Sequence, residues 1–328
     1  MTLNKTSILI LLLVLIFSSC QKVIEFSGSI TDPQMVVNCL LTPDSVVSAQ
    51  VSQSRFFLSN SATFESIDNA NVSLYVNGLL KDNSLTGKAN GLYAGAYKPV
   101  VGDSISLKVK IPGQNDITCG TTIPHPVGPF WINSNLELTG INTPIVAVVT
   151  PKTGGDPVTD TIGTSVGSRL FLSLTFKDNP DVTNYYRLVV YTKTYSGTKV
   201  TTDYTFYFDD IVSGNSTGDA VGPPTSLSSN KFNVFSDELF NGKQYSLKFS
   251  VDDNFNSYFP GQSRPQSSKS LFVNLQSISK SYYLYLQTRS NIKTNSFFAE
   301  PVQVYSNING GVGIIGGYTS SNTARINL

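Results

Sequence analysis

Apolar and polar residues alternate along most of the chain. Every second residue is apolar from Ile105 to Ile111, and again from Leu170 to Phe176. Successive side chains of a strand point to opposite faces of a sheet, so this period of two predicts half-buried β-strands. The same pattern, or a short apolar run, predicts further strands at residues 35–41, 47–51, 72–76, 117–123, 145–149, 185–195, 199–208, 245–251, 269–275, 302–305 and 313–318.

Turn signals lie between these strands. Asn77-Gly78 and Asn90-Gly91 are dipeptides in which both residues tolerate a positive φ, and Pro112-Gly113 follows the strand at 105–111. Such dipeptides between alternating segments are typical of tight connections between antiparallel strands. Short strands at this spacing predict a β-sandwich.

One segment has helical spacing instead. Ile278, Tyr282 and Leu286 recur every four residues, and Ser277 or Ser279 is available as an N-cap. The spacing predicts a helix near residues 278–290. Apart from the N-terminal segment described below, the sequence predicts this one helix.

The segment Pro124-His125-Pro126 divides the chain. Prolines on both sides of the histidine favour an extended, stiff connection. We therefore expect a mostly β protein with two β-sandwich domains. The first covers residues 30–125, and the second, larger one covers residues 126–328 and contains the helix.

The N-terminus predicts export and lipidation. Lys5 precedes an apolar run at residues 8–17, and Ser18-Ser19-Cys20 follows it. A positive residue, a short apolar segment and small residues before a cysteine are typical of a lipoprotein signal peptide. We expect a signal peptide at 1–19, a lipid on Cys20 and a tether at 20–29, because acyl chains hold a terminus on a membrane.

Charge excludes one class of partner. Only 14% of the residues are charged, and the net formal charge is +1. There is no basic stripe and no acidic tail, so the sequence gives no reason to expect nucleic-acid binding.

Two cysteines remain after Cys20. Cys39 and Cys119 each fall on the apolar face of a predicted strand. An exported protein can oxidise such a pair to a disulfide. Alternatively, both are buried free thiols that pack as small apolar side chains.

The sequence contains no recognisable catalytic constellation. His125 is the single histidine, which excludes histidine-cluster metal sites, and nothing near it would fix its tautomer as a general base. Phosphate-binding loops, zinc motifs and nucleophile elbows are missing. The glycines at 310–317 have no helix after them, so we interpret them as a hairpin in tightly packed strands. We expect a non-enzymatic protein without metal or cofactor.

Two groups of residues leave alternatives open. Acidic clusters near 178–181, 209–210 and 252–254 suit either calcium or turns, although none matches the EF-hand pattern. Aromatic clusters suit either a carbohydrate or protein platform or the sandwich cores. The aromatic clusters lie at 185–186, 204–208, 258–259 and 282–285.

A series of short motifs carries a family resemblance that spans the expected mature chain. In order, they are 69–72 (NANV), 91–93 (GLY), 184–187 (NYYR), 236–242 (SDELFNG), 281–286 (SYYLYL), 298–302 (FAEPV), 305–308 (YSNI) and 310–318 (GGVGIIGGY). In this order and spacing the sequence resembles domain-of-unknown-function family 4249. The C-terminal motifs are the most specific part of the resemblance.

The resemblance implies an outer-membrane lipoprotein of Bacteroidota. Its N-terminal domain looks like an immunoglobulin-like or carboxypeptidase-regulatory-like sandwich. Cys39 stands where the family more usually has glycine, which supports a disulfide with Cys119 particular to this chain. The family carries over no catalytic residues. Glu300 is the most tempting functional residue, although a carboxylate that accepts backbone hydrogen bonds in a tight turn is the favoured interpretation.

The resemblance also implies a partner. Members are typically encoded beside TonB-dependent receptors, so our leading hypothesis is an accessory or substrate-binding lipoprotein in nutrient uptake, facing the periplasm or the cell surface. The alternative is a surface lipoprotein for adhesion or for glycan or protein binding. A third hypothesis is a hydrolase built from two distant carboxylates.

Overall fold

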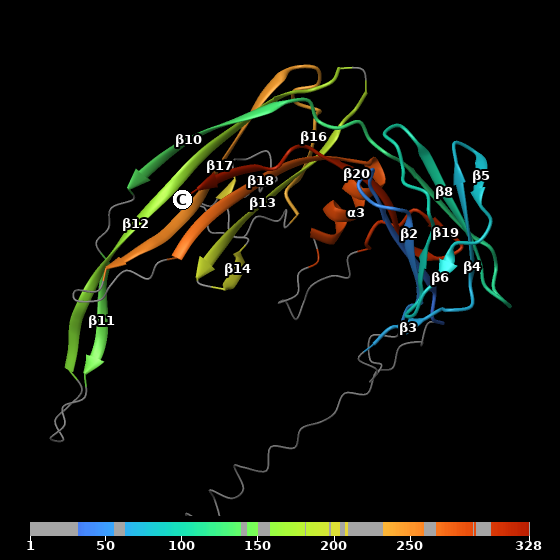
Figure 1. Ribbon diagram of the computed structural model, residues 1–328, viewed down its shortest axis with the longest axis horizontal. Helices are drawn as coiled ribbons and strands as arrows, with labels where there is room; N and C mark the ends of the chain where they lie inside the picture. The colour runs from blue at the N-terminus through green and yellow to red at the C-terminus, as the bar shows by residue number, and fades with distance from the viewer. Residues whose placement is uncertain are drawn as a thin grey trace, which may run out of the picture.

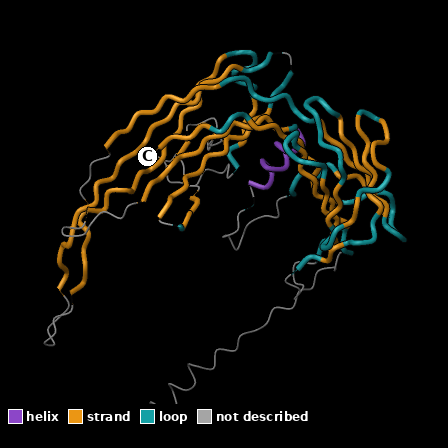
Figure 2. The backbone as a smooth tube through the Cα atoms, in the orientation of Figure 1, coloured by secondary structure: helices purple, strands orange, loops and turns teal. Residues whose placement is uncertain are grey.

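The computed structural model describes residues 32–55, 63–138, 143–149, 158–180, 182–196, 198–203, 207–208, 232–258, 267–290, 292 and 303–327. Strands dominate these residues, which confirms the mostly β class with sandwich domains. The described strands form three sheets, and the chain has the shape of an arch with two lobes (Figures 1 and 2).

The first lobe is a sandwich of two sheets around one core. One sheet contains β5 (Leu79–Asp82), β4 (Asn71–Val76), β8 (Ser104–Lys110), β9 (Ile117–Thr122) and β19 (Ile308–Asn309). The other contains β1 (Met35–Leu41), β2 (Ser48–Gln53), β3 (Glu65–Ser66), β7 (Leu92–Ala94) and β6 (Thr86–Gly87). The predicted alternation is confirmed, because Val37, Val51 and Leu107 point inward and are almost completely buried. Asn77 and Gly78 both have positive φ, as the turn prediction required.

The second lobe has the same construction. Its outer sheet contains β10 (Phe130–Leu138), β11 (Thr143–Val149), β12 (Val158–Lys177), β17 (Gln244–Tyr258) and β15 (Tyr207–Phe208). Its inner sheet contains β14 (Lys199–Asp203), β13 (Tyr185–Ser196), β16 (Val234–Ser236), β18 (Ser267–Ile278) and β21 (Ala324–Asn327). Leu174 and Phe176 of the outer sheet pack against Leu188 and Leu275 of the inner sheet.

Strand β20 (Val312–Ser320) joins the two lobes. It pairs with β1 in parallel and with β18 in antiparallel orientation, so the inner sheet runs without a break from one lobe into the other. Ile308 and Ile315 are buried in the core of the first lobe. The first lobe is therefore completed by β19 and β20, which the sequence grouped with residues 126–328.

The glycines at 310 and 311 do not form the hairpin that we expected. β19 pairs with β9, whereas β20 pairs with β1, so this turn crosses from one sheet of the first lobe to the other. A short apolar strand carries no local signal of which strand it will pair with, and this is why the sequence favoured the simpler connection.

The predicted helix is α3 (Lys280–Ser290), and its predicted N-cap is confirmed at Ser279. Ser279 Oγ accepts hydrogen bonds from the backbone N–H of Tyr282 at 3.3 Å and of Gly317 at 3.0 Å. The backbone N–H of Ser279 also donates to the Gly317 carbonyl at 2.8 Å. One side chain thus caps the helix and ties it to β20.

The helix lies close against β20, and glycine makes this approach possible. A Cβ atom on Gly316 would lie 2.8 Å from the Cβ atom of Tyr282. Gly313 of β20 lies beside strand β1. It has φ +120°, and a Cβ atom on it would lie 2.2 Å from the carbonyl oxygen of Val37. Both positions exclude larger residues because the neighbours are backbone or the first atoms of a side chain.

Gly316→Ala should destabilise the junction between the lobes. The added methyl group must push Tyr282 away, and overpacking of this kind costs about 1–3 kcal/mol. The measurement is urea unfolding followed by circular dichroism, with Gly128→Ala as the matched control because a Cβ on Gly128 meets nothing within 4 Å. Equal unfolding midpoints for the two variants would show that helix α3 does not depend on this close approach.

Candidate functional site

The inner sheet of the second lobe has one face in the core and one face toward the hollow of the arch (Figures 1 and 2). In β13, Leu188 and Val190 point into the core, so the alternate residues Arg187, Tyr191 and Lys193 point to the hollow. Cross-strand pairing extends this face over β18 and β21. We call it the concave face, and define it by Arg187, Tyr191, Lys193, Phe272, Asn274, Gln276 and Arg325.

Aromatic rings and cations pack together at one end of the concave face. Tyr191 and Phe272 are cross-strand partners whose rings stack with centroids 5.1 Å apart and an angle of 8° between their planes. Lys193 Nζ lies 5.7 Å from the Tyr191 centroid and 5.3 Å from that of Phe272. Arg325 Cζ lies 5.8 Å from the Phe272 centroid. The rings hold the two cations in place, since a cation is attracted to the face of an aromatic ring.

A second cationic group lies at the other end, beside helix α3. Arg187 Nη1 donates a hydrogen bond to Tyr282 Oη at 3.2 Å. Burial raises the pKa of Tyr282, although the charge of Arg187 opposes this effect, so the hydroxyl stays neutral and can accept that bond. Arg289 Cζ lies 5.5 Å from the Phe232 centroid and 5.9 Å from that of Tyr285.

Five buried polar side-chain atoms among the described residues have no hydrogen-bond partner, and three of them belong to the concave face: Arg187 Nε, Asn274 Oδ1 and Gln276 Oε1. The other two are Asp237 Oδ1 and Thr319 Oγ1. Asn274 is only 7% exposed, and its Nδ2 atom is fixed by bonds to Ser321 O at 2.6 Å and Thr323 Oγ1 at 3.2 Å. Buried polar groups are nearly always satisfied in native proteins. With one unused donor and two unused acceptors, the concave face is the candidate binding site.

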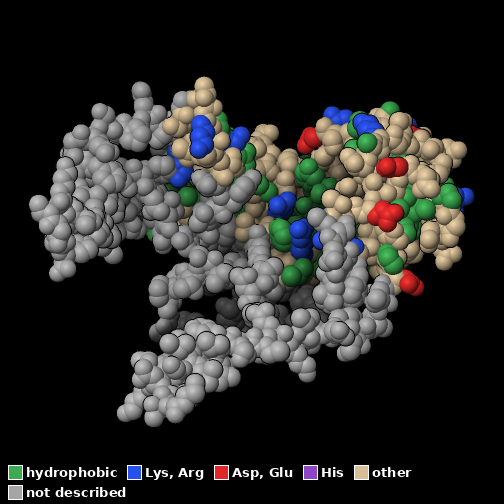
Figure 3. Space-filling model, turned by 90° about the horizontal axis from the view of Figure 1, so that it is seen from below, with side chains coloured by type: hydrophobic (Ala, Val, Ile, Leu, Met, Phe, Trp, Pro, Cys, Tyr) green, Lys and Arg blue, Asp and Glu red, His purple; other side chains and the backbone are tan. Residues whose placement is uncertain are grey.

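Most elements of this face lack acidic residues, although Asp203 lies on the neighbouring strand β14. Strands β13, β18, β20 and β21 and helix α3 contain no Asp or Glu. They contain six cationic residues: Arg187, Lys193, Lys269, Lys280, Arg289 and Arg325. Seen from below, the acidic side chains in view lie over the first lobe, whereas basic side chains lie over both lobes (Figure 3).

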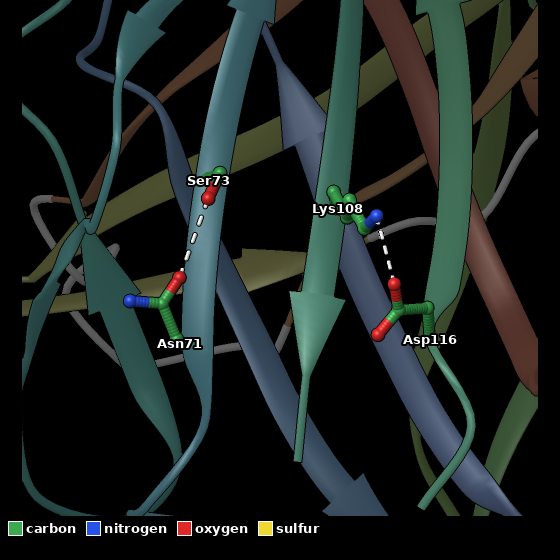
Figure 4. Close-up of polar contacts among 4 residues, drawn as sticks. All are labelled: Asn71, Ser73, Lys108 and Asp116. Carbon is green, nitrogen blue, oxygen red and sulfur yellow. Dashed lines mark hydrogen bonds and ion pairs between the residues drawn. The ribbon is translucent and has the colours of Figure 1, made fainter.

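In the first lobe, by contrast, a lysine forms an ion pair with a nearby carboxylate. Lys108 Nζ lies 2.7 Å from Oδ2 of Asp116, which directly precedes the neighbouring strand β9, and the neutral pair Asn71 and Ser73 lies close by (Figure 4). No carboxylate of the four strands or the helix just named could neutralise the concave face in this way.

Two buried carboxylates of the second lobe were the best remaining candidates for acid–base chemistry. Asp178 accepts hydrogen bonds from Tyr186 Oη, from Asn184 Nδ2 at 3.2 Å and from the Gly242 N–H at 2.7 Å. Asp237 Oδ2 accepts from the Asn184 N–H at 2.7 Å, whereas Asp237 Oδ1 is buried without a hydrogen-bond partner among the described residues. These bonds hold the turns around 178–184 and 237–242 together, so both carboxylates have structural roles.

A third buried carboxylate, Asp103, anchors the edge of the first lobe. It accepts hydrogen bonds from Tyr97 Oη at 2.6 Å, from the Val100 N–H at 2.8 Å and from Asn77 Nδ2 at 3.0 Å. Burial alone would raise the pKa of Asp103, but these bonds and the charge of Lys81 together lower it. The bond to Asp103 is also the main reason that the pKa of Tyr97 is raised to about 12.

The residues singled out from the sequence fall in different places. Cys20 and Glu300 lie outside the described residues. His125 is exposed. Asp252 lies within strand β17, paired with Arg169, rather than in a turn. Among the residues that the structure describes, no three His, Cys, Asp or Glu side chains are grouped as a metal site.

Cys39 and Cys119 lie in the same core of the first lobe, and both thiols are free and buried. The disulfide therefore stays a prediction. Burial raises the pKa of the Cys39 thiol, with a smaller contribution from Cys119, and it raises the pKa of Cys119 to about 12. Both thiols are protonated at neutral pH in this state, which makes them poor nucleophiles.

The sequence did not indicate the concave face. Its aromatic clusters at 185–186 and 282–285 flank the face, but Tyr186 is in the core. A usable signal was present in Tyr191-Thr192-Lys193, where the polar side of a half-buried strand carries a ring and a cation without any nearby acid.

The structure thus consists of two curved sandwiches that share a sheet, and a face with cations and aromatic rings lies on the concave side of one of them (Figure 1). The chain belongs to the family described as Domain of unknown function (DUF4249), whose sequence model matches residues 22–324. Comparison with curated proteins gives no match. In the part of the chain that the structure describes, no helix is long and apolar enough to cross a membrane.

One solved structure resembles this chain at 9% identity and a TM-score of 0.21. It is a crystal structure described as a candidate membrane-anchored protein from Corynebacterium diphtheriae. The match covers 77% of this chain and 56% of that chain, so this chain spans little more than half of the other's length. Similarity at this level supports no argument about function.

Asp103→Asn should lower stability at neutral pH and flatten its dependence on pH. An aspartate with a lowered pKa stabilises the fold above its unfolded pKa of about 3.9, and this contribution is lost as the pH falls through the folded pKa. The variant should lose about 1–3 kcal/mol at pH 7, and the difference from the wild type should shrink in the acid range below about pH 4.

Chemical unfolding at several pH values measures the effect of Asp103→Asn. Asp116→Asn is the control, because the exposed ion pair between Asp116 and Lys108 contributes little to stability. A constant difference between Asp103→Asn and the wild type from neutral to acid pH would contradict the lowered pKa.

In protein kept reduced, Cys39 and Cys119 should resist alkylation by iodoacetamide at pH 7 until the chain is unfolded. Only the thiolate reacts, and burial suppresses it. Mass spectrometry counts the added groups with and without denaturant. Fast labelling of either residue in the native protein would show that the first lobe opens around it.

Proposed function

We propose that the chain is a non-catalytic outer-membrane lipoprotein that serves as an accessory or substrate-binding partner of a TonB-dependent receptor in nutrient uptake. The lipid on Cys20 would anchor it, and the membership of family 4249 supports a bacterium of the Bacteroidota as its source. The observation that carries the binding role is the concave face, where fixed cations and unused polar atoms face the hollow of the arch.

The rigidity of the arch supports a carrier role. Strand β20 fixes the first lobe to the second through backbone hydrogen bonds, so a receptor that holds one lobe also orients the concave face of the other. The buried carboxylates Asp178 and Asp237 are engaged by local donors, which supports binding without catalysis.

A second candidate function is a free-standing surface lipoprotein for adhesion or for glycan or protein binding. The stacked pair of Tyr191 and Phe272 favours it, because partly exposed rings are common in binding surfaces. The two functions differ in whether a receptor accompanies the lipoprotein in the membrane.

Affinity purification of the native, lipidated full chain in a gentle detergent should recover a TonB-dependent β-barrel in near-stoichiometric amount. Mass spectrometry identifies what is recovered. A chain that is repeatedly recovered without any β-barrel would contradict the receptor role and favour the surface binder.

The anchor is tested separately. Cys20→Ala should move the chain from the membrane fraction to the soluble fraction, since acyl chains supply the attachment. Cys119→Ala, which removes a thiol elsewhere in the chain, should leave it on the membrane. Retention of Cys20→Ala in the membrane would contradict lipidation at this residue.

A further inference from the structure

We infer that the concave face binds an acidic oligosaccharide, a chain of sugars that carry carboxylate groups. The inference rests on the proposed binding function and names the ligand class of that same face. Its cations select the charge of the ligand, and its unused amide oxygens select the hydroxyl groups.

The charge argument comes from Lys193 and Arg325. Both lie against the Phe272 ring, so their positions are set before a ligand arrives. Arg325 Nε also donates to Ser270 Oγ at 3.1 Å, which limits its orientation further. Ring faces that already hold cations offer less area for stacking a neutral sugar, but they present two fixed positive groups to a carboxylate.

The polar argument comes from the other end of the face. Arg187 Nε is an unused donor, whereas Asn274 Oδ1 and Gln276 Oε1 are unused acceptors. Gln276 is the direct cross-strand partner of Arg187. A sugar acid supplies both kinds of group, because its carboxylate accepts from the guanidinium and its hydroxyls donate to the amide oxygens.

The length of the face indicates an oligomer rather than a single sugar. Arg187 and Lys193 lie on the same face of β13 and are separated by six residues, which corresponds to about 20 Å along a strand. A single sugar acid can reach only one end of this face. An extended chain can contact both, so affinity should rise with chain length.

An acidic peptide fits the same face less well. Peptides that bind sheets commonly add to an exposed edge strand. Here Arg187 and Lys193 lie on β13, whose backbone is paired with β18 on one side and with β14 and β16 on the other, and Arg325 lies on β21, which pairs with β18. The contacts available on the face are therefore made by side chains and suit a ligand with many hydroxyl groups.

The test uses the purified full chain in detergent and isothermal titration calorimetry with a defined oligogalacturonate. Lys193→Gln/Arg325→Gln should weaken binding at least tenfold, since each charged hydrogen bond contributes on the order of a factor of ten. The monomer galacturonate and the matching neutral galactose oligomer should bind more weakly than the acidic oligomer.

The matched control is Arg55→Gln/Lys81→Gln in the first lobe. Arg55 Cζ lies 5.1 Å from the Phe64 centroid and Lys81 Nζ lies 5.1 Å from the Tyr97 centroid, so this double variant removes the same charge from the same kind of contact. It should bind the oligogalacturonate as the wild type does. If both double variants lost affinity equally, the effect would come from net charge rather than from the concave face. That result would overturn the inference.

Three other results would also overturn it. They are no binding of oligogalacturonate, equally tight binding of the neutral oligomer, and tighter binding of a polyglutamate of equal charge, which would point to an acidic peptide. None of them alters the recovery of a receptor in the affinity purification. Conversely, a missing receptor leaves the calorimetry unaffected, so the two proposals fail separately.

Discussion

The pairing of β20 with both β1 and β18 is the constraint on which the architecture depends. Each lobe has its own buried core, and a smaller apolar cluster of Val234, Ile278, Tyr282 and Leu286 lies around helix α3. The backbone hydrogen bonds of β20 and the packing of this helix together set how the lobes are placed. In the sequence, β20 follows every other strand of the inner sheet except β21. The first lobe is complete only when the end of the chain has returned to it.

This arrangement explains why the C-terminal motif is rich in glycine. β20 passes between the first lobe and helix α3, and Gly316 lets the helix approach while Gly313 adopts a conformation that other residues avoid. Glycine loses more conformational freedom on folding than other residues, so each of these positions weakens the strand by itself. The helix cap at Ser279, which also bonds to Gly317, offsets part of that loss. The motif is thus explained by packing, without a nucleotide or phosphate ligand.

Local features were predictable and long-range features were not. The strand at Met35–Leu41, the turn at Asn77-Gly78 and the cap at Ser279 depend on neighbours in the sequence, and all three are found as predicted. Alternation identifies the two faces of a strand but not its partners, so the return of β19 and β20 to the first lobe could not be seen. The concave face was missed for the same reason, because Lys193 and Arg325 meet at Phe272 only through the pairing of β18 with β13 and β21. The position of a tyrosine in the sequence did not show whether its side chain is buried in the core. Tyr186 is a core residue, whereas its neighbour Tyr185 is only partly buried.

The concave face lowers the stability of the fold, and the packing of the two cores must offset this free energy. A buried polar atom without a partner costs about 1–3 kcal/mol, and three such atoms lie on this face. Like charges on neighbouring strands add repulsion, which the aromatic rings reduce by holding Lys193 and Arg325. Fully apolar or neutral residues at these positions would stabilise the sheet, because its other face already has a well-packed core. Unfavourable groups gathered on one face, on the concave side of an arch that β20 keeps in shape, are best explained by a ligand that satisfies them when it binds.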